Sequence, residues 1–199
     1  DKDALKDCHE VRSIYIPDSV TAISVNALTS CHILQSIHVA EDNPQYASEK
    51  GSLYNKSKTR LIYAMSYYIP DSVTEIGDKA FYYCHALPSI DIPDSVVRMN
   101  GSFSMNPLVR VGFGTDSQLR DIGLNTFGNC ADLNDIILPA QVETIDKDAF
   151  FACCSLQSIN FPEGLTTIGE KATPTIYYTL DNTDPKTSSS KQTYTAAIT

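Results

Sequence analysis

The chain of 199 residues contains no tryptophan, only three methionines and few charged side chains. Charged residues make up 20% of the sequence, and the net charge is -9. An acidic chain repels the phosphate backbone of nucleic acids and the anionic surface of bilayers, so neither is expected as a partner. The sequence also lacks an apolar run of about 18 residues, the length that a membrane-spanning helix needs. We therefore expect no membrane insertion in this chain.

Motifs of the common enzyme classes are missing as well. The sequence has no G-x-S-x-G, no G-x-G-x-x-G and no P-loop. None of the four histidines stands with a serine or cysteine in a known catalytic arrangement: His9, His32, His38 and His85. We expect no enzyme activity, no cofactor and no catalytic residues.

What the sequence has in abundance is a repeat of 23 residues. Boxes like Ile-Pro-Asp-Ser-Val begin at Ile16, Ile69, Ile92, Leu138 and Phe161. Two degenerate copies fill the longer intervals, because LQSIHV (34–39) aligns with LPSIDI (87–92), and LVRVGF (108–113) lies between the third and fourth boxes. The alignment predicts seven strand-like segments that end near Ile16, Val39, Ile69, Ile92, Phe113, Leu138 and Phe161.

Each repeat follows one pattern of strand, corner and turn. The segment L-x-x-I-x-I alternates apolar and polar residues as a strand does, and Pro-Asp-Ser ends it. The segment V-T-x-I is a second short extended piece, and Ala80-Phe81-x-x-Cys84 is expected to form a short helical turn with its apolar side chains inward. One such unit cannot bury its own apolar face, whereas stacked copies can. The repeat therefore predicts a solenoid of parallel strands about 4.8 Å apart.

These residues resemble the BspA-like (Treponema-type) leucine-rich repeat. The segments IPDSVTEIGDKAFYYCHALPSIDIP (69–93) and LPAQVETIDKDAFFACCSLQSINFP (138–162) carry its pattern most clearly. The resemblance implies a right-handed, β-rich leucine-rich-repeat solenoid over residues 1–171, with about seven repeats and a hairpin insertion at about 41–66. It also implies a bacterial protein that is secreted or held at the cell surface and binds host proteins or other cells.

The repeat breaks at Ala172, where Thr173-Pro174 replaces the expected phenylalanine. The segment TIYYTLDNTDPKTSSSKQTYTAAI reads as two strands joined by a turn and a loop. It resembles the middle of the chitobiase/hexosaminidase C-terminal module, a small immunoglobulin-like sandwich. We interpret residues 172–199 as a partial copy of that module.

Five of the six cysteines occupy one phase of the repeat: Cys8, Cys31, Cys84, Cys130 and Cys153. This phase predicts a structural ladder of small, buried, free thiols. Disulfides between turns of the stack are the alternative, although stacked side chains point in parallel. The pairs Cys8-His9, Cys31-His32 and Cys84-His85 also repeat, but no C-x-x-C or H-x-x-x-H spacing accompanies them. We therefore expect no metal site there.

Asp18, Asp71 and Asp94 share the corner of the box. A weak calcium site along this row is the functional interpretation. The structural one, which we prefer, is that these carboxylates cap backbone N–H groups at the corner. Other turns of the stack carry different residues at this place, so the row is interrupted.

Ligand binding is expected on the solvent side of the stacked strands. The residue between the two isoleucines of L-x-x-I-x-I faces outward, and two positions earlier a second column begins. The candidates for ligand binding are Tyr15, His38, Tyr68, Asp91, Arg110 and Asn160. Aromatic residues on three successive turns suit a peptide or a glycan, whereas plain cross-strand pairing would need no ligand. Tyr46 and Tyr54, in the insertion, are expected to form a second contact surface.

Three functions stay open from the sequence. The leading one is an adhesion module that binds a host extracellular or microbial surface protein. A carbohydrate-binding surface protein is the first alternative, because the tyrosines and the C-terminal segment both fit a glycan. A structural spacer without a ligand is the second.

Overall fold

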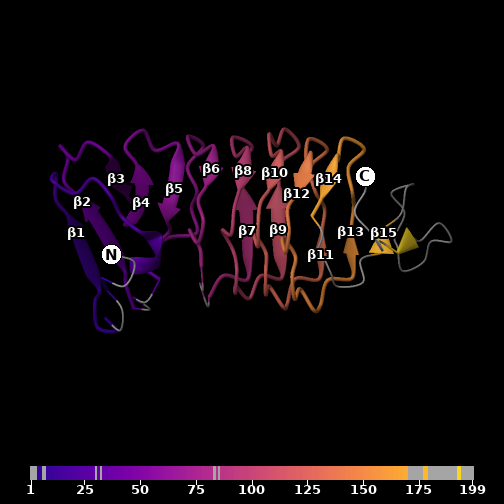
Figure 1. Cartoon of the computed structure of the whole chain (residues 1–199), viewed down its shortest axis with the longest axis horizontal. Coiled ribbons are helices and arrows are strands. Elements are labelled where there is room, and N and C mark those ends of the chain that lie inside the picture. The colour runs from indigo at the N-terminus through magenta and orange to yellow at the C-terminus, as the bar shows by residue number, and fades with distance from the viewer. Residues whose placement is uncertain are drawn as a thin grey trace.

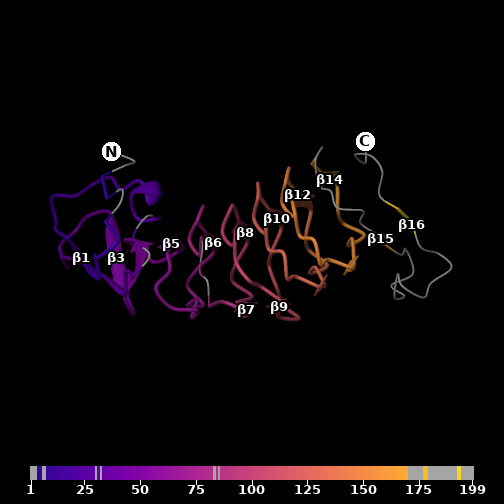
Figure 2. The same ribbon diagram turned by 90° about the horizontal axis from the view of Figure 1, so that it is seen from below.

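The computed structural model describes residues 4–5, 8–29, 31, 33–82, 84, 86–169, 177–178 and 192–193. Over the repeats, the chain winds as successive turns stacked along one axis (Figure 1, Figure 2). This confirms the predicted solenoid.

The L-x-x-I-x-I segments form the longer strands, whose outward side we call the strand face. They are β1 (Ser13–Ile16), β2 (Ser36–Val39), β7 (Ser89–Ile92), β9 (Arg110–Phe113), β11 (Asp135–Ile136) and β13 (Ser158–Ile159). The strands pair in parallel as β1–β2, β7–β9 and β11–β13, and β9 also contacts β11. Ile14 pairs with Ile37, 23 residues later, so the length of the repeat sets the register.

The V-T-x-I segments form a second ladder at a different side of the stack. Its parallel strands are β5 (Arg60–Tyr63), β6 (Glu75–Ile76), β8 (Arg98–Met99), β10 (Asp121–Ile122), β12 (Thr144–Ile145) and β14 (Thr167–Ile168). Two antiparallel strands, β4 (Ser52–Asn55) and β3 (Tyr46–Glu49), continue the sheet beyond β5.

The insertion contains an antiparallel hairpin of β3 and β4 that packs against the stack, which corrects the expectation of a separate contact surface there. Strands β3 and β4 belong to the second ladder, and the Lys50–Gly51 turn between them lies beside β2. The carbonyl of Gly51 accepts a hydrogen bond from the Ile37 amide at 2.8 Å. Leu53 and Tyr54 are buried, so their apolar surface holds the insertion against the stack.

One predicted strand is missing from the strand face. The segment that ends at Ile69 forms no strand, so β2 and β7 belong to separate sheets. Since Leu61 pairs with Ile76, β5 serves as the short strand of this turn of the stack. Eight residues separate Leu61 from Ile69, whereas sixteen separate Ile76 from Ile92. The chain is too short there to form the A-F-x-x-C turn of its neighbours.

The A-F-x-x-C turns are hydrogen-bonded turns rather than the helical turns predicted; the Cys130 amide, for example, donates to the Phe127 carbonyl at 3.0 Å. Among the described residues the helix is confined to one 3-10 turn, η1 (Val25–Ala27). A residue with positive φ precedes the phenylalanine in four successive turns: Lys79, Gly101, Asn125 and Asp148. Left-handed backbone at this place interrupts any helix, which explains the departure from the prediction.

Four phenylalanines from these turns form a stack inside the solenoid. Phe81, Phe103, Phe127 and Phe150 are fully buried, and their neighbouring ring centroids lie 5.0, 5.7 and 5.3 Å apart. The stack belongs to the larger of two hydrophobic clusters, which runs from Tyr54 to Ile168. A smaller cluster around Ile37 and Leu53 holds the first two repeats and part of the insertion.

The C-terminal segment is described only where β15 (Tyr177–Tyr178) pairs antiparallel with β16 (Gln192–Thr193). The rest of residues 170–199 lies outside the described residues. Both the resemblance to the chitobiase C-terminal module and the domain boundary at residue 171 therefore stay predictions.

Candidate functional site

At the N-terminal end, the strand face presents two aligned columns. Tyr15 pairs in register with His38, and both side chains are exposed, Tyr15 to 68%. Ser13 and Ser36 form the neighbouring column, where the Ser36 hydroxyl donates to Ser13 Oγ at 3.1 Å. The outward direction predicted for these residues is confirmed.

Tyr68 is exposed but lies outside any strand, so it does not continue the column by strand pairing. Its neighbour comes from the insertion, since Lys50 Nζ lies 3.6 Å from the centre of the Tyr68 ring. An exposed cation–π contact of this kind contributes roughly 0.5–1 kcal/mol. No sequence pattern indicated this pair, because the register of the insertion against β2 cannot be read from the repeat.

The insertion tyrosines do not form the exposed surface that the sequence predicted. Tyr54 is 1% exposed, and burial is the main cause that raises the pKa of its phenol. Tyr46 is half-buried, and its hydroxyl accepts a hydrogen bond from the Ile23 amide at 3.0 Å. Tyr54 is thus a core residue, and Tyr46 secures the loop around Ile23.

The middle of the strand face is a charged notch. Arg110 donates to Asp91 at 2.7 Å, and both side chains are more than half exposed, so this ion pair contributes little to stability. A cleft of about 460 Å³ opens here, and its floor includes Gly112 and Gly114. A Cβ at Gly112 would collide with the Asp91 carboxylate, so glycine leaves the space that this carboxylate occupies.

Toward the C-terminal end, the face carries Ile137, which is 78% exposed. Asn160 lies beside it in the next turn of the stack, but its amide is engaged with the backbone. Asn160 Oδ1 accepts from the Leu138 amide at 2.6 Å, and Nδ2 donates to the Leu138 carbonyl at 3.0 Å. Asn160 therefore has a structural task that the sequence did not reveal.

All five cysteines of the ladder are free thiols. Cys31, Cys130 and Cys153 are buried as predicted, whereas Cys8 and Cys84 are only half-buried. Burial raises the pKa of Cys84 to about 11 and those of Cys130 and Cys153 to about 12, so these thiols stay protonated at neutral pH. Cys154, outside the ladder, is exposed.

The ladder continues where the sequence pattern showed no cysteine. Asn106 is buried at the corresponding place, and its Nδ2 donates to the carbonyls of Phe81 and Phe103 at 2.7 and 2.9 Å. Cys130 and Cys153 likewise donate to Phe103 and Phe127. The position therefore requires a small side chain that can donate a hydrogen bond.

No group of three metal-binding side chains occurs within the described part of the chain. His32 and His85, from two of the repeated Cys-His pairs, lie outside the described residues. Asp71 and Asp94 both line the charged notch, and Asp94 Oδ1 is buried without a hydrogen-bond partner in the structure as described.

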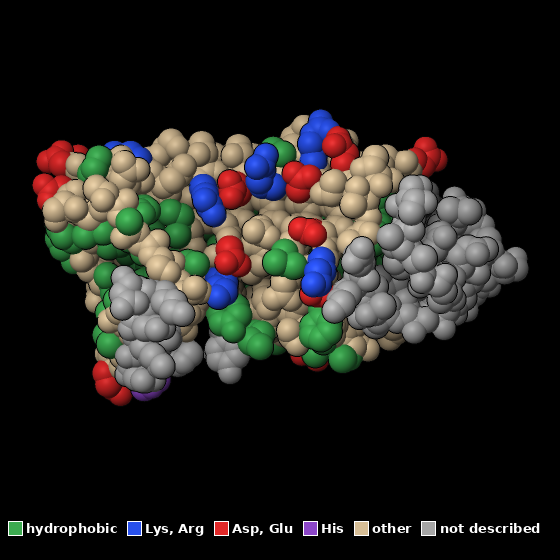
Figure 3. Space-filling view, in the orientation of Figure 1, with side chains coloured by type: hydrophobic (Ala, Val, Ile, Leu, Met, Phe, Trp, Pro, Cys, Tyr) green, Lys and Arg blue, Asp and Glu red, His purple; other side chains and the backbone are tan. Residues whose placement is uncertain are grey.

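The second ladder carries an alternating charge column that sequence reasoning missed. Its members are Arg60, Glu75, Arg98 and Asp121, in register on β5, β6, β8 and β10 (Figure 3). Arg60 Nε lies 3.2 Å from Glu75 Oε1. Because positive and negative side chains alternate along the column, their charges offset one another and the column has no electrostatic field of one sign. The sequence did contain a signal for this column: the third residue of the V-T-x-I segment alternates in charge from one repeat to the next.

A family profile described as the BspA type leucine-rich repeat region matches residues 1–64 and 62–173 in six copies. The chain belongs to the BspA-type leucine-rich-repeat family. The match covers the phenylalanine stack and both ladders, so the fold and the family agree over the same residues.

Two solved bacterial structures resemble this leucine-rich-repeat chain. A leucine-rich cell surface protein from Faecalibacterium prausnitzii A2-165 is 28% identical, with a TM-score of 0.67 over 82% of this chain and 48% of its own. The pneumococcal vaccine antigen PcpA is 20% identical, with a TM-score of 0.60 over 85% of this chain and 51% of its own, and shows the fold alone. This chain spans about half the length of each. No curated protein matches it.

The structure as described contains no helix with the length and apolar character needed to cross a bilayer.

Proposed function

We propose that this BspA-type chain is a secreted or cell-surface adhesion module that binds a protein of a host or another microbe through its strand face. The observation that carries the proposal is an exposed series of side chains: Tyr15 and His38 in register on the strand face, Lys50 with Tyr68 between β2 and β7 in the chain, and Asp91 with Arg110 on the strand face. Tyrosine and arginine are enriched in the centres of protein interfaces, and a rigid ladder fixes their spacing.

The surface chemistry also favours a protein over the other ligand classes. The net charge of -9 opposes nucleic acids and anionic lipids, and the strand face mixes aromatic groups with charges of both signs. The location outside the cell is supported by the Faecalibacterium relative, which is described as a cell surface protein.

Carbohydrate binding is the second candidate, because the Tyr15 ring is 68% exposed and available for stacking on a sugar. The polar groups that would orient a sugar are fewer, since Arg110 and Asp91 already pair with each other. The protein ligand therefore comes first.

A binding screen separates these functions. The purified chain is presented to immobilised extracellular-matrix proteins and to a glycan array in one buffer near physiological salt. A protein hit with a silent glycan array is the expected result. A glycan hit alone would replace the proposal with the carbohydrate alternative, and silence on both would leave the structural spacer.

A further inference from the structure

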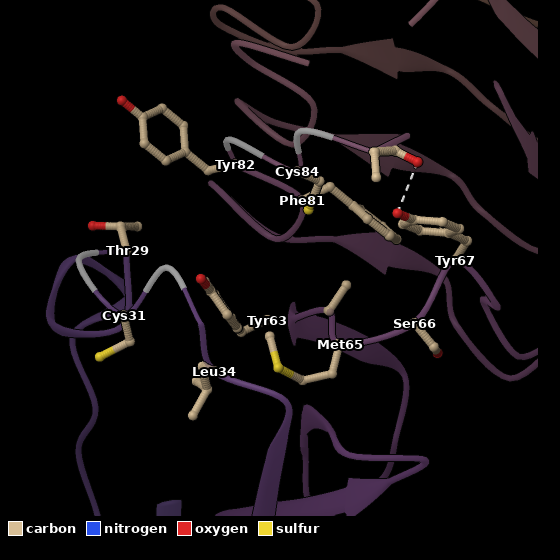
Figure 4. Close-up of a pocket in the computed structure, with 12 residues that line it drawn as sticks. Thr29, Cys31, Leu34, Tyr63, Met65, Ser66, Tyr67, Phe81, Tyr82 and Cys84 are labelled. Atoms are coloured by element: carbon tan, nitrogen blue, oxygen red, sulfur yellow. Dashed lines mark hydrogen bonds between the residues drawn. The ribbon is translucent and has the colours of Figure 1, made fainter. Parts of the chain in front are cut away.

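The missing turn of the stack leaves a cleft of about 280 Å³ between two repeats. Thr29, Cys31 and Leu34 form one wall, and Phe81, Tyr82 and Cys84 form the opposite wall (Figure 4). Residues 63–67 cross between the walls in place of the absent A-F-x-x-C turn. The cleft therefore exists because the segment from Leu61 to Ile69 is eight residues shorter than the matching segment from Ile76 to Ile92.

The cleft lies at the end of the phenylalanine stack. Phe81 stacks on Phe103 at 5.0 Å, whereas the repeat before Phe81 supplies no phenylalanine. Tyr63 replaces part of the missing turn, because its hydroxyl donates to the Leu28 carbonyl at 3.3 Å as the ladder cysteines do elsewhere. The space that an additional ring would occupy is thus only partly filled.

The lining selects an uncharged and largely apolar group. None of the described side chains that line the cleft is charged. The hydroxyls of Thr29, Tyr63 and Tyr67 are already bound to backbone carbonyls, that of Tyr67 to Ala86 at 2.8 Å. Ser66 points away from the cleft (Figure 4). A charged or strongly polar group would lose its hydration here without gaining partners.

We propose that this cleft binds one aromatic side chain presented by a partner protein. Tyr67, which is 51% exposed, offers a ring at the rim, and Phe81, Met65 and the sulfur atoms of Cys31 and Cys84 offer the polarizable surroundings that favour aromatic groups. Its volume of about 280 Å³ exceeds the roughly 150 Å³ of a cavity that holds one benzene ring, so a large ring such as an indole has room there. The site is separate from the strand face and does not depend on the function proposed for it.

The test uses N-acetyl-tryptophanamide as the probe and the methyl signals of the three methionines as the readout. Met65 lines the cleft, whereas Met99 is buried in the second ladder and serves as the internal control. We expect a saturable shift of the Met65 methyl signal, with Met99 unchanged. N-acetyl-lysinamide, a charged probe, should leave both signals in place.

Two variants locate the probe. Tyr67→Ala should weaken binding roughly three- to tenfold, the value of one aromatic contact. Ala86→Phe should fill the cleft and abolish the shift. Tyr15→Ala, on the strand face, should bind as the parent does. Without probe, an unchanged Met99 signal shows that the large cluster of each variant is folded, and an unchanged Met65 signal shows the same of the small cluster.

Three outcomes would overturn the proposal. The first is a Met65 signal that does not move, and the second is a shift that the lysine probe reproduces or that both cleft variants retain. The third is a Met65 shift that follows protein concentration without any probe, because it would place a second copy of the chain in the cleft. These Met65 shifts do not depend on the binding screen, so the strand-face proposal can fail while the cleft proposal holds.

Discussion

At the scale of single residues, four turns of the stack share a buried backbone carbonyl that accepts a hydrogen bond from a side chain of a later turn. The carbonyls of Leu28, Phe81, Phe103 and Phe127 receive hydrogen bonds from Tyr63, Asn106, Cys130 and Cys153, respectively. An unmet carbonyl in this buried place would cost about 1–3 kcal/mol. The cysteine ladder therefore combines small size with a donor, which explains why asparagine can replace it.

Asn106 tests this explanation directly. Asn106→Ala removes the donor to two carbonyls, so we expect a loss of about 2 kcal/mol in the free energy of unfolding. Asn106→Asp has nearly the same shape but faces the carbonyls with acceptors, so the loss should be larger at neutral pH. Urea denaturation of both variants measures the difference. Equal stability of the aspartate variant and the parent would contradict the account.

The buried thiols predict a loss of stability at alkaline pH. The ordinary pKa of a cysteine thiol, 9.0, applies in the unfolded chain, whereas burial raises the pKa of Cys130 and Cys153 in the folded state to about 12. Between these values the unfolded state holds fewer protons, so the free energy of unfolding falls as the pH rises. Each thiol contributes about 1.4 kcal/mol per pH unit.

Denaturation curves at about pH 8, 10 and 11 measure this dependence. Below the ordinary thiol pKa of 9.0 the thiols should give no slope, because both states are protonated. Cys130→Ala is the matched variant: it should unfold more easily at the lowest pH yet show a shallower decline at the two higher ones. A decline of the same steepness in parent and variant would exclude the thiol as its source.

At the scale of elements, the sequence predicted the strands that recur with the repeat and their register. The register of β1 on β2 and of β11 on β13 follows from the 23-residue period and from an alternating pattern that buries every second residue. The prediction of helical turns was wrong because residues such as Lys79 and Asp148 adopt positive φ. A lysine or an aspartate in the sequence is not enough to predict that backbone conformation.

The insertion is the element that the sequence could not place. Its strands pair antiparallel and join the second ladder, and nothing in the period specifies such a pairing. The outward columns were predictable at Tyr15, His38 and Arg110, since these lie on regular strands. The place of Lys50 was not predictable, because it depends on where the insertion packs. The cleft beside Phe81 was not predictable either, because it depends on β5 serving as the short strand of its turn of the stack.

Tyr54→Ala tests whether the insertion is part of the core. The Tyr54 side chain is buried, so its truncation should cost about 3–5 kcal/mol, as for other large aromatic residues in cores. Tyr15→Ala, on the exposed strand face, should change stability by less than about 1 kcal/mol. Thermal unfolding of both variants measures the two losses of stability. A loss for Tyr54→Ala as small as that for Tyr15→Ala would show that the insertion is not part of the core.

At the scale of the molecule, the two hydrophobic clusters divide the stack unevenly. The first two repeats and Leu53 of the insertion share the small cluster around Ile37, whereas Tyr54 and the remaining repeats share the large one. Regions with fewer buried contacts open at lower free energy. The first repeats should therefore exchange their amides before the centre of the stack does.

Hydrogen exchange under native conditions measures this difference. The Ile37 amide bonds to Gly51, and the Gly123 amide bonds to Met99 in the large cluster. We expect the Ile37 amide to exchange at least about tenfold faster. Equal rates would mean that the two clusters open as one unit.

The most direct measurement of the central claim, protein binding by the strand face, compares two variants against the partner found in the screen. The double variant Tyr15→Ala with Tyr68→Ala removes two exposed rings from the strand face, and Phe151→Ala removes a ring of matched exposure, 48% against 49% for Tyr68, from an A-F-x-x-C turn. The account predicts at least about tenfold weaker binding of the double variant at unchanged stability, with Phe151→Ala equal to the parent. Unchanged affinity of the double variant would contradict it.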